Sequence, residues 1–272
     1  MKRETVLAAA CIAFVFNVGC AVLRPVAIPA SPKHIPADLV DDSSSSIEFG
    51  SRLPVVDGIG WCLGIPDKLL LWDRRISNHR ISEDTAIVMA DYLAENDLPH
   101  IKVRANQYAP LEDFKRLRKN TTVGWPWRYS IGLASVAGEA ILPGRLFGGD
   151  HFNPYTQTIH LYSDIPAIAL HEGGHAKDFA RRKYQGTYAA AYLFVPLWHE
   201  TIASRDAFAF LEDRGEVERI KEANRILYPA YGTYIGSGIG SLASGASVPI
   251  YYGSVLAGHI NGRLLSRSYE QD

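Results

Sequence analysis

The sequence predicts an α+β protein, with a small sheet and a mostly helical C-terminal half. Three observations support this prediction. Residues 156–163 alternate between polar and apolar side chains, which is typical of a half-buried or edge strand. Ser163, Asp164 and Pro166 then mark the start of a helix, and residues 226–262 hold eight glycines but no Asp, Glu, Lys or Arg.

Composition excludes several classes of protein. The 272 residues carry 28 Lys and Arg against 29 Asp and Glu, which gives no electrostatic reason to expect a nucleic-acid partner. Hydrophobic residues make up 47% of the chain, so a wholly disordered chain is excluded. Cys11 and Cys20 lie near the N-terminus, which leaves Cys62 alone in the body of the chain and excludes a disulfide scaffold.

The N-terminal residues 1–23 are interpreted as a signal peptide or N-terminal anchor. Two basic residues precede an uncharged stretch over residues 5–23, and Arg24 ends it. Cleavage, retention as an anchor, and lipidation at Cys20 as in a bacterial lipoprotein remain open. All three predict export to a bacterial-type cell envelope, either periplasmic or tethered to the membrane through this segment.

Residues 24–52 are expected to form a flexible tether. Four prolines fall between residues 25 and 36, and a serine-rich polar tract follows at 41–46. The folded domain is then predicted over residues 53–272. Within it, Ser82 is expected to cap a helix, residues 101–104 to form a short strand, and Pro110 to open a second helix.

The helix predicted after Pro166 carries the motif His171-Glu172-Gly173-Gly174-His175. Four helical residues turn the chain by about 400°, so both histidines project from one face and can hold a single ion. Glu172 lies about 100° further round, where it can take a proton from a water molecule on that ion. Neutral imidazoles suit Zn²⁺, and an open catalytic site needs one more protein ligand.

The two glycines of the motif each cost a helix about 1 kcal/mol relative to alanine. Either a neighbouring backbone packs closely against them, or the preceding strand and a substrate along it need the clearance.

Glu200 is the candidate third ligand, since it lies on the small-residue face of a helix predicted over residues 200–211. A carboxylate buried there is costly unless it is paired or bound to a metal. A surface salt bridge for Glu200, and His199 as the ligand in its place, remain alternatives. Asp178 lies seven residues after His171, on the same helix face, and is expected either to accept a hydrogen bond from a ligand imidazole or to be solvated.

Residues 150–212 resemble the zincin metallopeptidases, in particular the gluzincin branch, in the HExxH motif and the downstream Glu200. The resemblance implies a zincin-like fold, one Zn²⁺ per chain held by His171, His175 and Glu200, and Glu172 as the general base. It also implies that an edge strand before the active helix pairs with extended substrate. The polar side of that strand here consists of Thr158, His160 and Tyr162.

The chain departs from the gluzincin pattern at one position. Several gluzincins place an aspartate four residues after the ligand glutamate, where it orients a histidine. That position is Ser204 here, and Asp206 follows two residues later. Ser204 therefore joins Asp178 as a candidate for orienting a ligand side chain.

Residues 226–262 are expected to form a buried helical hairpin, with a membrane-associated hairpin as the alternative. Gly232, Gly236 and Gly240 recur at a spacing of four, which gives a helix a smooth groove for close contact with another helix. Pro249 is expected to break or kink such a helix.

Together these patterns predict a zinc-dependent metallopeptidase that acts on a peptide or protein substrate. A zinc hydrolase of a non-peptide amide or ester, and a non-catalytic envelope protein with a structural metal site, are the alternatives.

Overall fold

The computed structural model describes residues 23–29, 35–40, 46–192, 194–241 and 247–269. The expected signal peptide, with the lipidation candidate Cys20, lies outside these residues except for Leu23, as does most of the serine-rich tract. The chain divides into two compact units where the sequence predicted one domain. We call Ile28–Val195 the sheet unit, and Pro196–Asp272 with Met1–Ala27 the helical unit.

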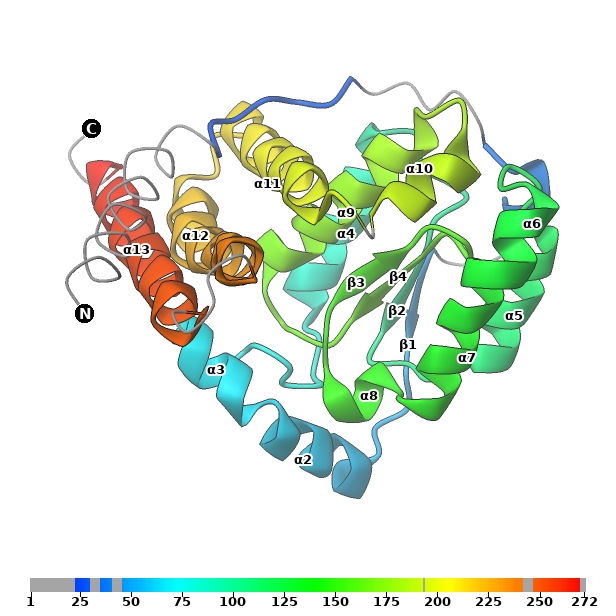
Figure 1. Cartoon of the computed structure of the whole chain (residues 1–272), viewed down its shortest axis with the longest axis horizontal. Coiled ribbons are helices and arrows are strands. Elements are labelled where there is room, and N and C mark those ends of the chain that lie inside the picture. The colour runs from blue at the N-terminus through cyan, green and yellow to red at the C-terminus, as the bar shows by residue number, and fades with distance from the viewer. Residues whose placement is uncertain (1–22, 30–34, 41–45, 193, 242–246, 270–272) are drawn as a thin grey trace. The chain divides into compact units, whose positions relative to one another are not determined.

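The sheet unit contains a mixed four-stranded sheet in the order β1-β2-β4-β3 (Figure 1). The strands are β1 (Ile47–Phe49), β2 (Lys102–Ala105), β3 (His151–Asn153) and β4 (Thr158–Leu161). The first, second and fourth run parallel, and β3 runs antiparallel to β4. The α+β prediction is thus confirmed.

The predicted edge strand is wrong. β4 pairs with β2 on one side and with β3 on the other, so among the described strands β3 forms the edge next to β4. Thr158, His160 and Tyr162 are all buried, at 2% exposure or less. The alternation of β4 reflects a polar side that packs inside the protein, and it does not mark a side that meets solvent or substrate.

The predicted tether is also wrong for two of its segments. Ile47–Phe49 forms β1, which pairs with β2. In the helical unit, the Val26 N–H donates to the Arg205 carbonyl at 3.2 Å, and the Arg205 Nε donates to the Arg24 carbonyl at 2.9 Å. Leu23, just before the tether, is buried at 1% exposure.

Helices lie on both sides of the sheet (Figure 1). α4 (Glu83–Glu95) packs against α9 (Pro166–Ala180), and α5 (Pro110–Lys119) packs against α7 (Leu133–Ile141). Ser82 caps α4 as predicted, because its hydroxyl accepts from the Thr85 N–H at 3.3 Å. The remaining helices of this unit are α2 (Pro54–Leu63), α3 (Ile65–Leu71), α6 (Trp125–Trp127), α8 (Gly144–Phe147), α10 (Gln185–Ala191), the 3₁₀ turn η1 (Ala37–Leu39) and the π-helical η2 (Arg128–Gly132).

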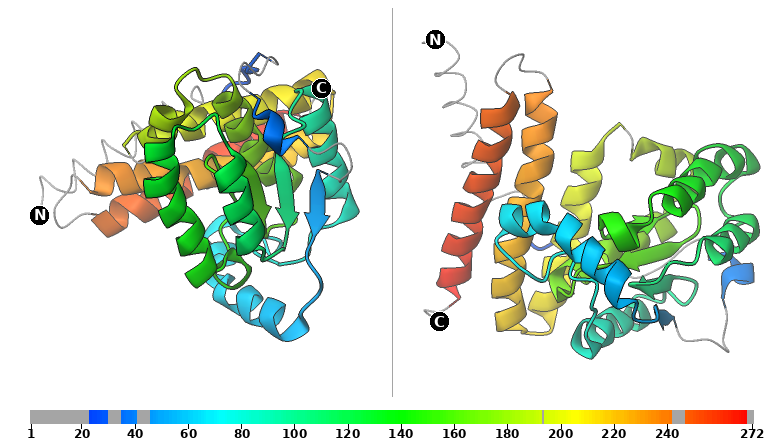
Figure 2. Two further views of the ribbon diagram at one scale, coloured as in Figure 1. Left: turned by 90° about the vertical axis from the view of Figure 1, so that its right-hand side faces the viewer. Right: turned by 90° about the horizontal axis from the view of Figure 1, so that it is seen from below.

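The helical unit consists of α11 (Pro196–Asp213), α12 (Val217–Gly240) and α13 (Ser247–Ser268). α12 and α13 run side by side as an antiparallel hairpin (Figure 2). Gly232, Gly236 and Gly240 of α12 lie at the contact, as predicted. A Cβ on Gly232 would come within 2.6 Å of the Ser254 carbonyl oxygen, and one on Gly236 within 2.7 Å of the Tyr251 Cα.

Pro249 does not break a helix. It lies in the first turn of α13, where its missing N–H has no intrahelical partner to lose, whereas Pro229 lies inside α12. A search of the described residues for helices of membrane-spanning length and hydropathy found none.

Candidate metal centre

α9 begins at Pro166, which supplies a helical φ angle, and Ile165 before it has an extended backbone. The two polar residues expected to cap the helix serve other elements. The Asp164 carboxylate accepts from the hydroxyls of Ser82 and Thr85 at the start of α4. Ser163 donates its hydroxyl to Asp150. Proline and the preceding extended residue therefore start α9 without a side-chain cap.

His171 and His175 lie one turn apart on α9, and their Nε2 atoms are 3.1 Å from each other. The ring planes meet at 86° and the ring centroids are 4.7 Å apart. Two nitrogens that each lie about 2.0–2.1 Å from a tetrahedral zinc ion are separated by about 3.3 Å. The two imidazoles therefore already hold nearly the separation that a shared zinc ion requires.

Glu172 follows His171 on the same helix and is 7% exposed. A carboxylate at this depth sits in surroundings of lower dielectric than water, where its interaction with a nearby cation or a polarised water molecule is strengthened. Its position, one residue along the helix from a candidate ligand, suits a proton acceptor beside the metal better than a ligand.

Gly173 lies against α4. A Cβ at this position would lie 2.6 Å from Cε1 of the Tyr92 ring and 3.3 Å from the Met89 methyl group. Of the two expectations for the motif glycines, close packing of a neighbouring element describes Gly173 better than clearance for a substrate strand. The close neighbour is, however, a side chain of α4 and not a backbone.

Asp178 takes neither of its expected roles. It is buried at 3% exposure, and it accepts from Arg182 Nη2 at 2.5 Å and from the Tyr188 hydroxyl. Burial, followed by the Asp178 charge, raises the pKa of Tyr188, which keeps this hydroxyl protonated as a donor. Asp178 therefore joins the C-terminal end of α9 to α10, and its carboxylate is not solvated.

Tyr192 is a neighbour of the histidine pair that sequence reasoning missed. Its ring centroid lies 5.6 Å from that of His175 and 5.9 Å from that of Tyr188. The spacing of four between Tyr188 and Tyr192 could have indicated that both rings share one helix face. Residues 184–198 are uncharged, however, and the sequence alone predicts that they belong to the core.

The polar side of β4 forms a separate buried cluster. His160 lies 3.9 Å from Asp113 and 4.0 Å from Glu139, and Tyr162 donates its hydroxyl to Glu139 at 3.1 Å. Burial lowers the pKa of His160 far below its usual value, so its ring is neutral. The His160 ring stacks on that of His151 with 9° between the planes, and two nearly parallel rings cannot both aim a nitrogen at one ion.

In the helical unit, Glu200 lies in the first half of α11. It is 8% exposed, so the alternative of a surface salt bridge does not describe it. Ala203, Ser204 and Ala207 are buried on the same helix, as the small-residue pattern predicted. The rival ligand His199 is 1% exposed, and its ring lies 5.0 Å from that of Trp198.

Comparison with models of protein families, with curated proteins and with solved structures found no match to this chain.

Proposed function

We propose that this chain is a zinc-dependent metallopeptidase in which His171, His175 and Glu200 hold one Zn²⁺ and Glu172 is the general base. The observation that carries the proposal is the 3.1 Å separation of the two Nε2 atoms across one turn of α9. Each of the three proposed ligands offers one ligand atom, two imidazole nitrogens and one carboxylate oxygen, a set that leaves a fourth position for water.

The proposed chemistry divides between the metal and Glu172. Zinc, when bound, lowers the pKa of a coordinated water toward about 7 and polarises the substrate carbonyl. Glu172 takes a proton from the attacking water and delivers it to the leaving nitrogen as the C–N bond breaks. The near-complete burial of this carboxylate supports its assignment to proton transfer.

Glu200 belongs to the helical unit and the two histidines belong to the sheet unit. Our proposal therefore includes a zinc ion that links the two units. Its support is chemical: Glu200 is a buried carboxylate among small side chains, and such a group needs a cation or strong donors around it.

For the substrate we propose an extended peptide segment that adds to β3. Of the described strands, β3 is the edge on the side of β4, the strand that runs into α9. Main-chain hydrogen bonds to such an edge select for extended peptide and tolerate many side chains. Export to the cell envelope through residues 1–23 remains part of the proposal.

The test compares Glu172→Gln with Glu218→Gln, the same chemical change at a side chain of α12 that is 85% exposed. With zinc measured by elemental analysis and hydrolysis by a peptide library, we expect one zinc per chain in both variants. We expect the rate to fall on the order of a thousandfold in Glu172→Gln alone.

Loss of zinc is expected in His171→Ala, because one imidazole and one carboxylate hold the ion poorly. An unchanged rate in Glu172→Gln, or a parent chain without bound zinc, contradicts the proposal. Hydrolysis of ester or non-peptide amide substrates in place of peptides would identify a different zinc hydrolase.

A further inference from the structure

α13 presents a stripe of large apolar side chains to its surroundings, one in each turn. Their exposed fractions range from 40% to 64%. The stripe consists of Val248, Tyr252, Leu256, Ile260 and Leu264. Because four helical residues turn the chain by about 400°, each side chain is displaced by about 40° from the one before. The first three therefore share one face, and we call Val248, Tyr252 and Leu256 the apolar face of α13.

Charge is segregated along the hairpin. Residues 217–225 of α12 are rich in charged side chains, whereas residues 226–240 of α12 and 247–262 of α13 have no Asp, Glu, Lys or Arg. Because the helices are antiparallel, the two uncharged segments lie at the same end of the hairpin. At 1.5 Å per residue this end is about 22 Å long. A water-facing helix pair normally carries charges along its whole outer surface.

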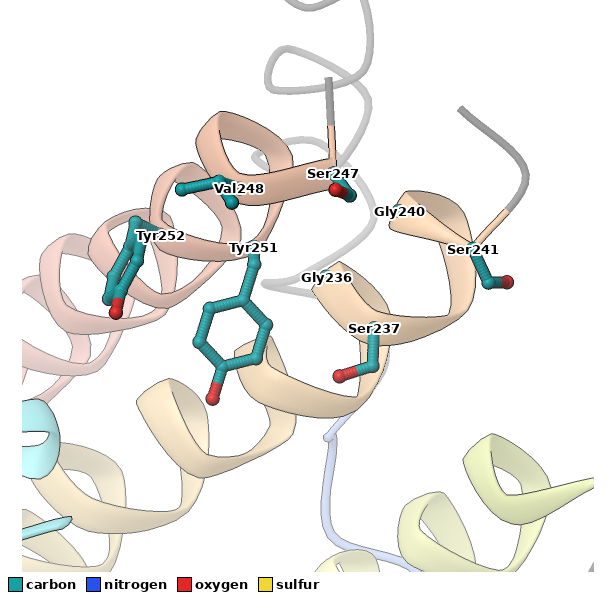
Figure 3. A pocket seen from close by; sticks show the side chains of 8 residues that line it. All are labelled: Gly236, Ser237, Gly240, Ser241, Ser247, Val248, Tyr251 and Tyr252. Atoms are coloured by element: carbon teal, nitrogen blue, oxygen red, sulfur yellow. The ribbon is translucent and has the colours of Figure 1, made fainter. Parts of the chain in front are cut away.

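A groove opens between the two helices at this end, with a volume of about 370 Å³ (Figure 3). Glycines and a serine of α12 line it together with Ser241, and α13 contributes Ser247, Val248, Tyr251 and Tyr252. Figure 3 shows both tyrosine hydroxyls directed away from the ends that the interhelical connection joins. Tyrosines with apolar rings and polar tips are typical of the interface between a bilayer and water.

The helical unit also contains the segment that follows the uncharged N-terminal stretch. Leu23–Ala27 lies in this unit, and Val26 and Arg24 bond to Arg205 on α11. Residues 5–23, of which all but Leu23 lie outside the described residues, are long enough to span a bilayer. Two of the three expected fates of this stretch, retention and lipidation, hold the helical unit at a membrane.

We propose that the uncharged end of the α12–α13 hairpin docks onto a lipid bilayer through the apolar face of α13, and rests in the interfacial region without spanning the membrane. Burial of Val248, Tyr252 and Leu256 among headgroups and upper acyl chains removes exposed apolar surface from water. Away from the helix ends, the backbone groups of α12 and α13 bond within each helix, so contact along the side of α13 removes few unpaired backbone groups from water. This inference is independent of the metal centre.

The experiment uses the full chain with Cys11, Cys20 and Cys62 replaced by serine, reconstituted into vesicles of equal parts phosphatidylcholine and phosphatidylglycerol. A nitroxide label is attached at Leu256→Cys, at Tyr252→Cys, or at the control Glu218→Cys, which lies at the charged end of α12. Collision of each label with oxygen, which concentrates in lipid, is compared with collision with a water-soluble nickel complex. Circular dichroism establishes that each variant is folded.

We expect the oxygen-to-nickel ratio at positions 252 and 256 to exceed that at position 218 by about threefold or more. Equal ratios at the three positions overturn the proposal. Low accessibility to both reagents at positions 252 and 256 also overturns the proposal. In that case, dipolar broadening between labels would show that a second copy of the chain covers the apolar face of α13. Without such broadening, another segment of the same chain covers it.

Discussion

Asp178 is held by two donors from a single neighbouring stretch, Arg182 and the Tyr188 hydroxyl. Asp178→Ala removes a carboxylate that is 3% exposed and accepts from both donors, while the Arg182 side chain is 33% exposed and can still reach water, so we expect the free energy of unfolding to fall by about 1–3 kcal/mol. Zinc content should not change, because the hydrogen bonds of Asp178 come from Arg182 and Tyr188.

Urea unfolding and elemental analysis of Asp178→Ala measure both quantities. A variant of normal stability that has lost zinc would restore the earlier expectation that Asp178 orients a ligand imidazole.

His100 gives stability a pH dependence. Burial, and after it the charge of Arg116, lowers the pKa of His100 from 6.5 to about 4 in the folded protein. Between these values the unfolded chain binds a proton that the folded chain does not. The contribution of His100 to the free energy of unfolding is therefore fully present above pH about 6.5. It is lost as the pH falls toward about 4, and this loss is about 3 kcal/mol at most.

Urea unfolding of the parent chain and of His100→Gln at several pH values between 7.5 and 4 tests this dependence. The variant is expected to lose less stability than the parent across the interval. Parallel curves for the two proteins would assign the acid sensitivity to other groups, such as the buried His160.

For single residues, the sequence predicts those positions that depend only on the geometry of one helix. The spacing of His171 and His175 places both rings on one face of any helix, and the structure has them there. Tyr188, which bonds to Asp178, lies on α10, and Tyr192, the neighbour of His175, directly follows that helix. The direction of α10 depends on tertiary packing, which the spacing of residues along α9 does not contain.

α4 and α9 meet at Gly173 without room for a methyl group, because the Tyr92 ring lies where a Cβ would be. Gly173→Ala should therefore destabilise the fold by about 1–3 kcal/mol, in spite of the better helix propensity of alanine. Gly58→Ala is the matched control in α2, where a Cβ meets nothing within 4 Å. We expect it to stabilise by about 0.5–1 kcal/mol.

Thermal unfolding of the two variants measures this difference. Tyr92→Leu combined with Gly173→Ala should recover part of the loss, since the smaller side chain makes room. Equal melting temperatures for Gly173→Ala and Gly58→Ala would contradict the close contact.

The elements differ in how well the sequence predicts them. The helix after Ser82 and the glycine-rich hairpin follow from caps and spacing, which are local. β1 is three residues long in a region of prolines and serines, and its pairing with β2 alone makes it a strand. Alternation in β4 does not separate an edge strand from an interior strand, because the polar side chains of this segment are buried: His160 lies near Asp113, and Tyr162 donates to Glu139.

For the whole molecule, the proposed zinc ion links two units that each fold around their own contacts. We expect calorimetry to show one transition with zinc, and two after the metal is removed by a chelator. The zinc-bound protein should melt at the higher temperature, because the ion binds the folded state.

Glu200→Gln should show two transitions even with zinc present, because it removes the proposed ligand of the helical unit. A single transition in every condition would mean that zinc does not join the units.

The division into two units was not predictable from the sequence. Residues 23–27 belong with α11, about 180 residues later, through bonds to Arg205. Composition separates the uncharged C-terminal segment from the rest, but it does not place a boundary between Val195 and Pro196, which lie inside a continuous uncharged stretch.

The brevity of β3 has one more consequence. A peptide that paired with His151–Asn153 would find only three strand residues, so few main-chain hydrogen bonds would form and the peptide would bind weakly. Two copies of the chain also gain little free energy by pairing their β3 edges, which disfavours the growth of fibrils from the folded protein. If the chain is the peptidase that we propose, the same weak pairing would let cleaved fragments leave quickly, and turnover would then depend on how fast a new peptide arrives.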